Sequence, residues 1–142
     1  MRSDPHTAFG EKIMKKSESL KKRADFQRVY REGTSFANRY LVMYVRKNDL
    51  EKNRVGISVS KKVGNSVVRH RITRLIRESY RLNEERFVEG LDMVVIARPG
   101  AKEKNFFVIE SALLHLLRLH KIGPEHEEKD VKEHEKDSDL SD

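Results

Sequence analysis

The chain has 142 residues and no cysteine, with 30 lysines and arginines against 23 aspartates and glutamates. Its length predicts one domain. The absence of cysteine excludes disulfides, cysteine-ligated metal sites and thiol nucleophiles. Apolar runs are far shorter than the roughly 20 residues of a membrane span, and the start lacks an apolar signal-peptide core. We therefore expect a cytoplasmic protein with no membrane partner.

The positive charge is unevenly distributed along the chain. Residues 124–142 hold nine acids and three lysines, whereas residues 1–123 hold 27 basic and 14 acidic side chains. This excess favours a polyanionic partner, because lysine and arginine displace condensed counterions from phosphates. Nucleic acid is the leading partner class, ahead of an anionic membrane, since no predicted helix pairs a basic face with a bulky apolar one.

The two ends of the chain differ from its middle. Residues 1–13 show no sustained period and precede a second methionine, Met14, so we expect a disordered leader or extension there. Residues 124–142 are acidic and polar with almost nothing to bury, and we expect a disordered tail. The predicted domain therefore spans residues 14–123.

The domain is expected to begin with one short helix. Residues 14–24 are basic and are predicted to be irregular. After them, Phe26, Val29 and Tyr30 follow the i, i+3, i+4 spacing of a helix face. Gly33 is predicted to end this helix in a left-handed conformation.

Strand signals follow the helix. Residues 40–46 are rich in aromatic and β-branched residues, residues 54–60 alternate aliphatic and small side chains, and the polar turn between them predicts an antiparallel pair. A third strand is predicted over residues 92–98. One further short strand is expected around residues 34–38 or within 40–47.

Two longer helices are predicted, over residues 66–82 and 105–120, and the first has an apolar and a basic side. Its apolar side holds Val68, Ile72, Leu75, Ile76 and Ser79. Its other side holds His70, Arg74, Arg77 and Arg81, flanked by Arg71. Solvated helix faces normally mix charges in i, i+4 pairs, but only Glu78 opposes these arginines. The pattern favours phosphate binding, for which the planar guanidinium is well suited.

The loop before this helix, residues 61–65, reads Lys-Lys-Val-Gly-Asn. It offers backbone N–H groups and the positive end of the helix dipole to a phosphate. A Gly-Asn pair is also a common turn and helix cap. The loop matches neither of the glycine-rich nucleotide-binding patterns, so it does not predict nucleotide binding of those kinds.

Residues 54–78 together closely resemble the protein subunit of bacterial ribonuclease P. The motifs that carry the resemblance are Ser60-Lys61-Lys62, Gly64-Asn65, Arg69-His70-Arg71 and Arg74-Leu75-Ile76-Arg77, and it extends from about Leu20 to Leu119. His70 departs from the family pattern, which has asparagine there. The resemblance implies an α+β fold, a two-layer sandwich ordered α-β-β-β-α-β-α with a left-handed βαβ crossover, like domain 2 of ribosomal protein S5.

The resemblance also implies two RNA-binding surfaces. One binds the catalytic RNA subunit through Lys61, Lys62, Asn65, Arg69, His70, Arg71, Arg74 and Arg77. The other holds the 5′ leader of precursor tRNA through Lys22, Phe26, Tyr30, Tyr44 and Ser58. Spacing alone favours a core role for Phe26 and leaves Tyr30 and Tyr44 open. Bases stack on aromatic rings with little regard to sequence, which suits leaders of variable sequence.

The sequence gives little support to a protein catalytic centre. Its six histidines lack metal-binding spacing, and no nucleophile and base are placed together. We predict no catalytic or metal-binding side chain, and the resemblance implies that the RNA subunit binds Mg²⁺ and hydrolyses the substrate.

The predicted function is that of the ribonuclease P protein subunit, which promotes removal of the 5′ leader from precursor tRNA. Its expected partners are the catalytic RNA and precursor tRNA, and no protein partner is evident in the sequence. The alternative is a non-catalytic ribosomal or other structured-RNA-binding protein. A nuclease that cleaves without RNA is a third class.

Overall fold

The computed structural model describes residues 16–123, so the predicted extension 1–13 and acidic tail 124–142 lie outside the described residues. The elements in chain order are β1 Ser17–Ser19, α2 Arg23–Glu32, β2 Thr34–Ala37, β3 Leu41–Lys47, β4 Asn53–Ser58, α3 Ser66–Leu82, η1 Glu84–Arg86, β5 Leu91–Ala97, η2 Pro99–Ala101 and α4 Phe106–His120. Among these, no helix has the length and apolar character needed to cross a bilayer.

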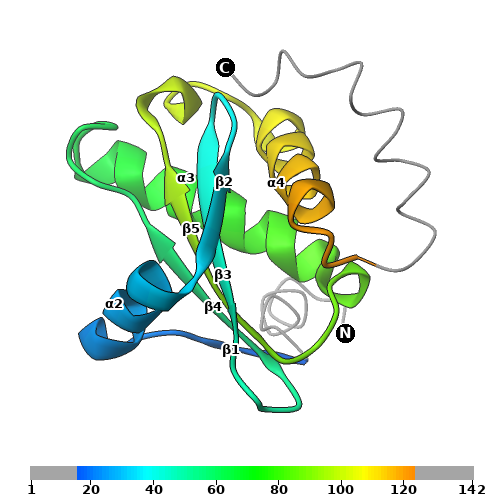
Figure 1. Ribbon diagram of the computed structural model, residues 1–142. Helices are drawn as coiled ribbons and strands as arrows, with labels where there is room; N and C mark the ends of the chain where they lie inside the picture. The colour runs from blue at the N-terminus through cyan, green and yellow to red at the C-terminus, as the bar shows by residue number, and fades with distance from the viewer. Residues whose placement is uncertain (1–15, 124–142) are drawn as a thin grey trace, which may run out of the picture.

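Five strands form one mixed sheet in the order β1-β4-β5-β3-β2 (Figure 1). Strand β4 is parallel to both β1 and β5, whereas β3 is antiparallel to both β5 and β2. The α+β class and the parallel unit β4-α3-β5 agree with the sequence prediction. The further short strand is β2, at the first of the two positions considered for it.

The predicted direct pairing of residues 40–46 with 54–60 is wrong, because β5 lies between β3 and β4. Strand β5 pairs with β3 over Leu41–Lys47 and with β4 over Arg54–Ser58. It is buried along nearly its whole length, as expected of a central strand. A polar turn between two strands predicts that the chain changes direction. It does not determine whether these two strands pair with each other or with a third strand.

Residues 14–24 were predicted to be irregular, but Ser17–Ser19 form the edge strand β1. Their backbone pairs with Asn53–Val55 of β4, and the Ser17 hydroxyl lies 2.7 Å from the Tyr80 hydroxyl. Leu20, which follows, is 5% exposed. The strand is stabilised by these tertiary contacts, which the local sequence does not reveal.

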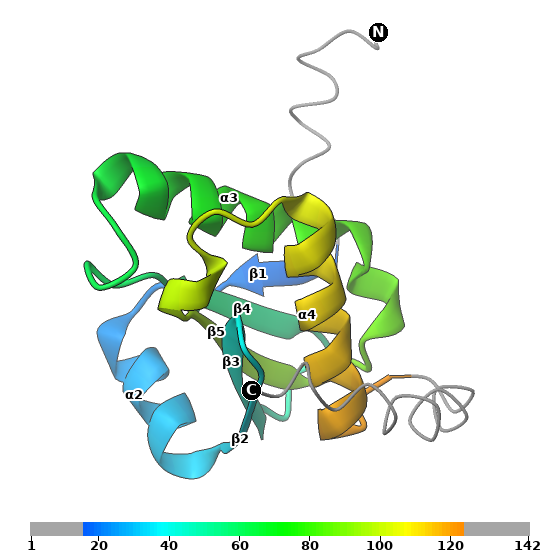
Figure 2. The same ribbon diagram turned by 90° about the horizontal axis from the view of Figure 1, so that it is seen from above.

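The helices lie on both faces of the sheet (Figure 2). Helices α3 and α4 cover one face and enclose the main core, in which Leu41, Met43, Ile72, Ile76 and Leu113 are fully buried. Helix α2 packs on the opposite face over a smaller cluster of Leu20, Val29 and Val94. The large core forms a two-layer sandwich, and the face under α2 is covered only in part.

Gly33 ends α2 as predicted, but its backbone is extended, with φ −90° and ψ 169°, and not left-handed. A Cβ at this position would lie 2.6 Å from the carbonyl oxygen of Val29 and 2.9 Å from that of Val45. Glycine is required here because two backbone segments approach closely. The resulting tight exit places β2 directly beside β3.

Candidate nucleic-acid interface

Helix α3 is held in a fixed orientation, so its outer face is well defined. The Asn65 side-chain oxygen accepts a hydrogen bond from the Val68 N–H at 3.0 Å, which caps the first turn. Ile72 and Ile76 are fully buried, and Val68 and Leu75 pack at the edge of the core. The apolar side of the helix is therefore the one that its spacing predicts.

The outer face of α3 exposes cationic side chains. His70, Arg74 and Arg77 are exposed, and among the described residues neither arginine has a carboxylate partner. Arg81 differs, because its guanidinium contacts the Glu78 carboxylate at 2.5 Å and 3.2 Å. Arg74 and Arg77 are thus the arginines of this face that lack a fixed protein acceptor.

Two arginines predicted to bind RNA are engaged with the protein itself. Arg71 donates to the carbonyl oxygens of Lys102 at 3.2 Å and Lys104 at 2.7 Å, which ties α3 to the loop before α4. Arg69 donates to the carbonyl oxygen of Gly64 at 3.1 Å. Both side chains position neighbouring segments, whatever other contacts they make.

The loop before α3 presents two further exposed cations, Lys61 and Lys62. The loop is anchored by Val63, which is 2% exposed and whose N–H donates to the Ser60 carbonyl at 3.0 Å. The lysines therefore stand on a fixed turn at the N-terminal end of α3, where the helix dipole also favours an anion.

A group of aromatic residues lies between α2 and the strands on the opposite face of the sheet, where the resemblance implies a cleft for the leader. Phe26 of α2 rests directly on Gly56 of β4, since a Cβ at Gly56 would lie 2.5 Å from the end of the Phe26 ring. Phe26 is half-buried, so it packs on the sheet and still presents part of its ring to solvent. Phe26 therefore packs against the small cluster under α2, as spacing favoured, and its binding of a leader stays a prediction.

Tyr30, Tyr44 and Ser58 converge beside Phe26. The ring centroids of Tyr30 and Tyr44 are 5.0 Å apart in an edge-to-face contact, and those of Phe26 and Tyr30 are 6.5 Å apart. The pKa of Tyr30 is raised, mainly because the side chain is partly buried. A hydrogen bond with the Ser58 side chain acts in the opposite direction, and the nearby Tyr44 adds to the increase. Tyr30 remains 37% exposed. Lys22 is exposed at the start of α2, so all five predicted residues lie on α2 or the strands under it.

A buried carboxylate at the end of this face was not predicted from the sequence. Asp92 of β5 is 1% exposed and accepts hydrogen bonds from Arg54 at 2.7 and 2.8 Å, from Asn48 at 2.9 Å and from Arg46 at 3.2 Å. Burial acts to raise the pKa of Asp92, but the hydrogen bonds and positive charges of its partners outweigh it, so the pKa is below the usual range.

The same two arginines connect the sheet to α2. Arg54 lies 3.6 Å from the Asp25 carboxylate, and Arg46 donates to Glu32 at 3.1 Å. Asp25 and Glu32 stand near opposite ends of α2. The network therefore holds both ends of the helix to the strands. In the sequence, the only sign of this network was one aspartate, Asp92, within an otherwise apolar strand.

Other candidate sites offer less chemistry. Within residues 16–123, no group of three or more His, Cys, Asp or Glu side chains could hold a metal ion. A groove of about 450 Å³ lies between Phe36, Lys47 and His120 at the β2 edge. It contains none of the residues predicted to bind RNA.

Several known proteins are similar in sequence to this chain. The sequence model of the family described as Ribonuclease P matches residues 14–121. The "Ribonuclease P protein component" of Lachnoclostridium phytofermentans is 67% identical over 106 residues, which cover 75% of this chain and 91% of that protein. The component of the same name from Alkaliphilus metalliredigens is 54% identical over 109 residues, covering 77% of this chain and 98% of that protein.

Solved structures share the fold. The RNase P protein of Staphylococcus aureus is 42% identical, with a TM-score of 0.69 over 75% of this chain and 97% of that chain. The RNase P protein of Thermotoga maritima is 36% identical, with a TM-score of 0.66 over 70% of this chain and 94% of that chain. Sequence and fold therefore lead to the same group of proteins.

Proposed function

The chain belongs to the family of ribonuclease P proteins, and on that premise we propose that it binds the catalytic RNA through α3 and the precursor tRNA leader through the aromatic cleft. As a protein component of ribonuclease P, it acts in the processing of tRNA 5′ ends, and the RNA subunit carries the catalysis. The observation that best supports the proposed interface is that Arg74 and Arg77 are exposed on α3 without a carboxylate partner among residues 16–123.

Arg74 and Arg77 support binding of RNA by α3 because nothing in the described part of the chain neutralises them. Exposed guanidinium groups without carboxylate partners are available to phosphate oxygens. Lys61 and Lys62 extend this cationic surface to the turn before the helix, and His70 adds a hydrogen-bonding side chain between them. Asn65, Arg69 and Arg71 support the same interface mainly by holding the loop and the helix in place.

The cleft suits a single-stranded leader. Bases can stack on the half-buried rings of Phe26 and Tyr44 and on the more exposed ring of Tyr30. Gly56 and Ser58 have small side chains and leave space on the sheet below these rings. Lys22 provides a charge for the backbone phosphates at the edge. Stacking without base-specific hydrogen bonds tolerates different leader sequences.

The two proposed surfaces are connected through one short segment. Strand β4 ends at Ser58 in the cleft, and α3 begins at Ser66, so Lys61 and Lys62 lie between the two surfaces along the chain. A substrate leader in the cleft and the RNA subunit on α3 would therefore meet near this loop. In this proposal, the RNA subunit would hold the Mg²⁺ that supports hydrolysis, and no side chain of the protein would bind it. The protein would act in the cytoplasm together with its RNA.

A non-catalytic RNA-binding protein would use the same cationic helix face. That function does not explain why three aromatic side chains remain partly exposed beside Gly56. Family membership favours the ribonuclease P assignment over that alternative.

The test is cleavage of precursor tRNA at low Mg²⁺ concentration by the full chain alone, by ribonuclease P RNA alone and by both together. We expect cleavage to require the RNA and to be stimulated by the protein. Cleavage by the protein alone would contradict the proposed division of labour. Binding of the RNA without stimulation would favour the non-catalytic alternative.

A further inference from the structure

The most exposed large apolar side chains of the described chain are those of Val67, 76% exposed, and Phe107, 72% exposed. Each lies in the first turn of its helix, Val67 in α3 and Phe107 in α4. Phe107 does not serve the core, which α4 enters through fully buried residues such as Ile109 and Leu113. Its packing partner is the half-buried Phe106, at 5.5 Å between ring centroids.

Arg71 connects the two parts of the chain that carry these side chains. Val67 precedes Arg71 by four residues, so the two are neighbours on one side of α3. The Arg71 guanidinium donates to the carbonyl oxygens of Lys102 and Lys104, in the loop that leads to α4. We refer to Val67, Arg71 and Phe107 as the Arg71 patch.

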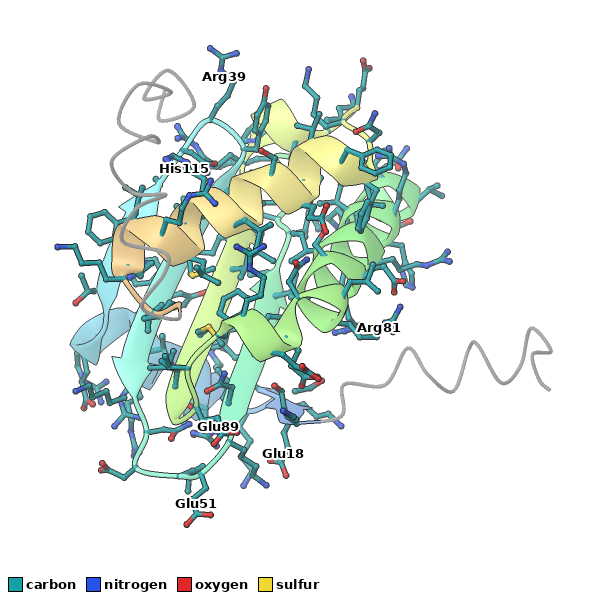
Figure 3. The ribbon with its side chains drawn as sticks, turned by 90° about the vertical axis from the view of Figure 1, so that its right-hand side faces the viewer. Glu18, Arg39, Glu51, Arg81, Glu89 and His115 are labelled. Atoms are coloured by element: carbon teal, nitrogen blue, oxygen red, sulfur yellow. The ribbon has the colours of Figure 1, made fainter. Side chains whose placement is uncertain are left out.

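The beginning of α4 is held to α3 and its cap at a second point. Glu110, three residues later and on the same side of α4, accepts a hydrogen bond from the Asn83 side chain at 2.9 Å. Phe107 thus lies between Lys104 and Glu110, the two points at which this part of the chain is hydrogen-bonded to α3 and its cap. Figure 3 shows the beginning of α4 beside α3 on one side of the molecule.

The patch continues the cationic face of α3. Arg74 follows Arg71 by three residues and carries an exposed side chain without a carboxylate partner in the described part of the chain. Acidic residues are also near in the sequence, because Glu103 lies between Lys102 and Lys104 and Glu110 follows Phe107 by three residues, so the patch itself is not strongly cationic. Because the Phe107 ring is exposed and the Arg71 guanidinium is already bound to two carbonyl oxygens, the patch favours stacking of a base over binding of a phosphate.

We propose that the Arg71 patch binds an unpaired base of the RNA subunit, which stacks on Phe107 while Arg74 contacts the adjoining phosphate. The proposal rests on the proposed function, in which α3 faces the RNA subunit, and it extends that interface to α4. It assigns a role to Phe107, for which the sequence pattern predicts none.

The test measures binding of the full chain to ribonuclease P RNA over a range of salt concentrations. Phe107→Ala is expected to weaken binding by roughly 5- to 150-fold, the loss of one stacked base. The slope of log affinity against log salt should not change, because no phosphate contact is removed. Phe107→Tyr should retain binding, whereas Phe107→Leu should lose it, since leucine is apolar but has no aromatic face.

Phe36→Ala is the matched control, because Phe36 is an exposed aromatic side chain, 39% exposed, on β2. It should leave affinity for the RNA subunit unchanged. The thermal unfolding of each variant, measured alone, separates loss of binding from loss of folding.

Three results would overturn the proposal. The first is unchanged affinity in Phe107→Ala. The second is equal binding by the leucine and tyrosine variants. The third is concentration-dependent self-association of the chain that Phe107→Ala abolishes, which would make the patch a protein contact. If Arg74→Ala with Arg77→Ala also leaves the salt slope unchanged, the RNA interface on α3 is itself misplaced, and the two failures are thereby distinguished.

Discussion

The arginines of α3 differ in their protein contacts, and this difference predicts unequal roles in RNA binding. Arg74 and Arg77 are exposed, whereas the Arg81 guanidinium is held by Glu78 at 2.5 Å. If the proposed interface is correct, replacing Arg74 and Arg77 together by alanine removes two phosphate contacts. Each contact contributes about 0.7 to 0.9 to the slope of log affinity against log salt. The double variant should therefore lose about 1.4 to 1.8 of that slope.

This change has a measurable consequence between 50 and 200 mM salt. Over that fourfold range, the fold-loss of affinity for ribonuclease P RNA should be about 7 to 12 times larger for the parent chain than for the double variant. Filter binding or fluorescence anisotropy at four or five salt concentrations resolves such a difference.

Arg81→Ala is the matched control, since it removes the same side chain from the same helix face. Because Glu78 already neutralises Arg81, its loss should change the slope by much less than the loss of Arg74 or Arg77. Equal slope changes in all three single variants would show that the Glu78 contact does not matter for RNA binding. An unchanged slope in the double variant would refute the assignment of this face.

Three further predictions concern the cleft and its support. Phe26→Ala should weaken binding of precursor tRNA that carries a leader by roughly 5- to 150-fold, and should leave binding of mature tRNA to the holoenzyme unchanged; equal losses for both substrates would indicate a purely structural role. Gly56→Ala should displace the Phe26 ring, since the new Cβ would lie 2.5 Å from it, and should cost about 1 to 3 kcal/mol in urea unfolding with weaker leader binding; unchanged stability and binding would argue against this close contact. Asp92→Ala leaves Arg54 and Arg46 without their buried carboxylate and should cost about 3 to 5 kcal/mol in the same assay. Because the folded-state pKa of Asp92 is lowered, its stabilisation is complete at neutral pH and is lost as the pH falls through that lowered pKa. Acid titrations of stability should therefore be shallower for Asp92→Asn than for the parent chain, and identical pH profiles would contradict the network.

The helices and the apolar side of α3 could be predicted because their signals are local. The 3.6-residue period placed Ile72 and Ile76 in the core, and both are fully buried. Asn65 before this period indicated a helix cap, and its side chain caps α3 at 3.0 Å. Such features depend on residues within one or two turns of each other, so the sequence alone is sufficient to predict them.

The contacts of polar side chains could not be predicted in the same way. Spacing put Arg71 beside Arg74 on the basic side of α3, but Arg71 reaches carbonyl groups more than 30 residues away in the sequence. Asp92 appeared only as a polar residue in an apolar strand, and its four hydrogen bonds come from β3, β4 and the turn between them. The hydrogen-bond partners of a long side chain depend on which distant segments the fold places near it.

The sequence by itself determined the helices, the cationic helix face, the family and therefore the RNA partner, because periodicity, charge and motif are properties of neighbouring residues. Only the tertiary structure decided that β5 separates β3 from β4, that Phe26 rests on Gly56, and which arginines remain unpaired. Those outcomes depend on burial and hydrogen bonding between distant segments. A strand buried on both faces takes the centre of the sheet, and each guanidinium binds the acceptors that the folded chain places within its reach.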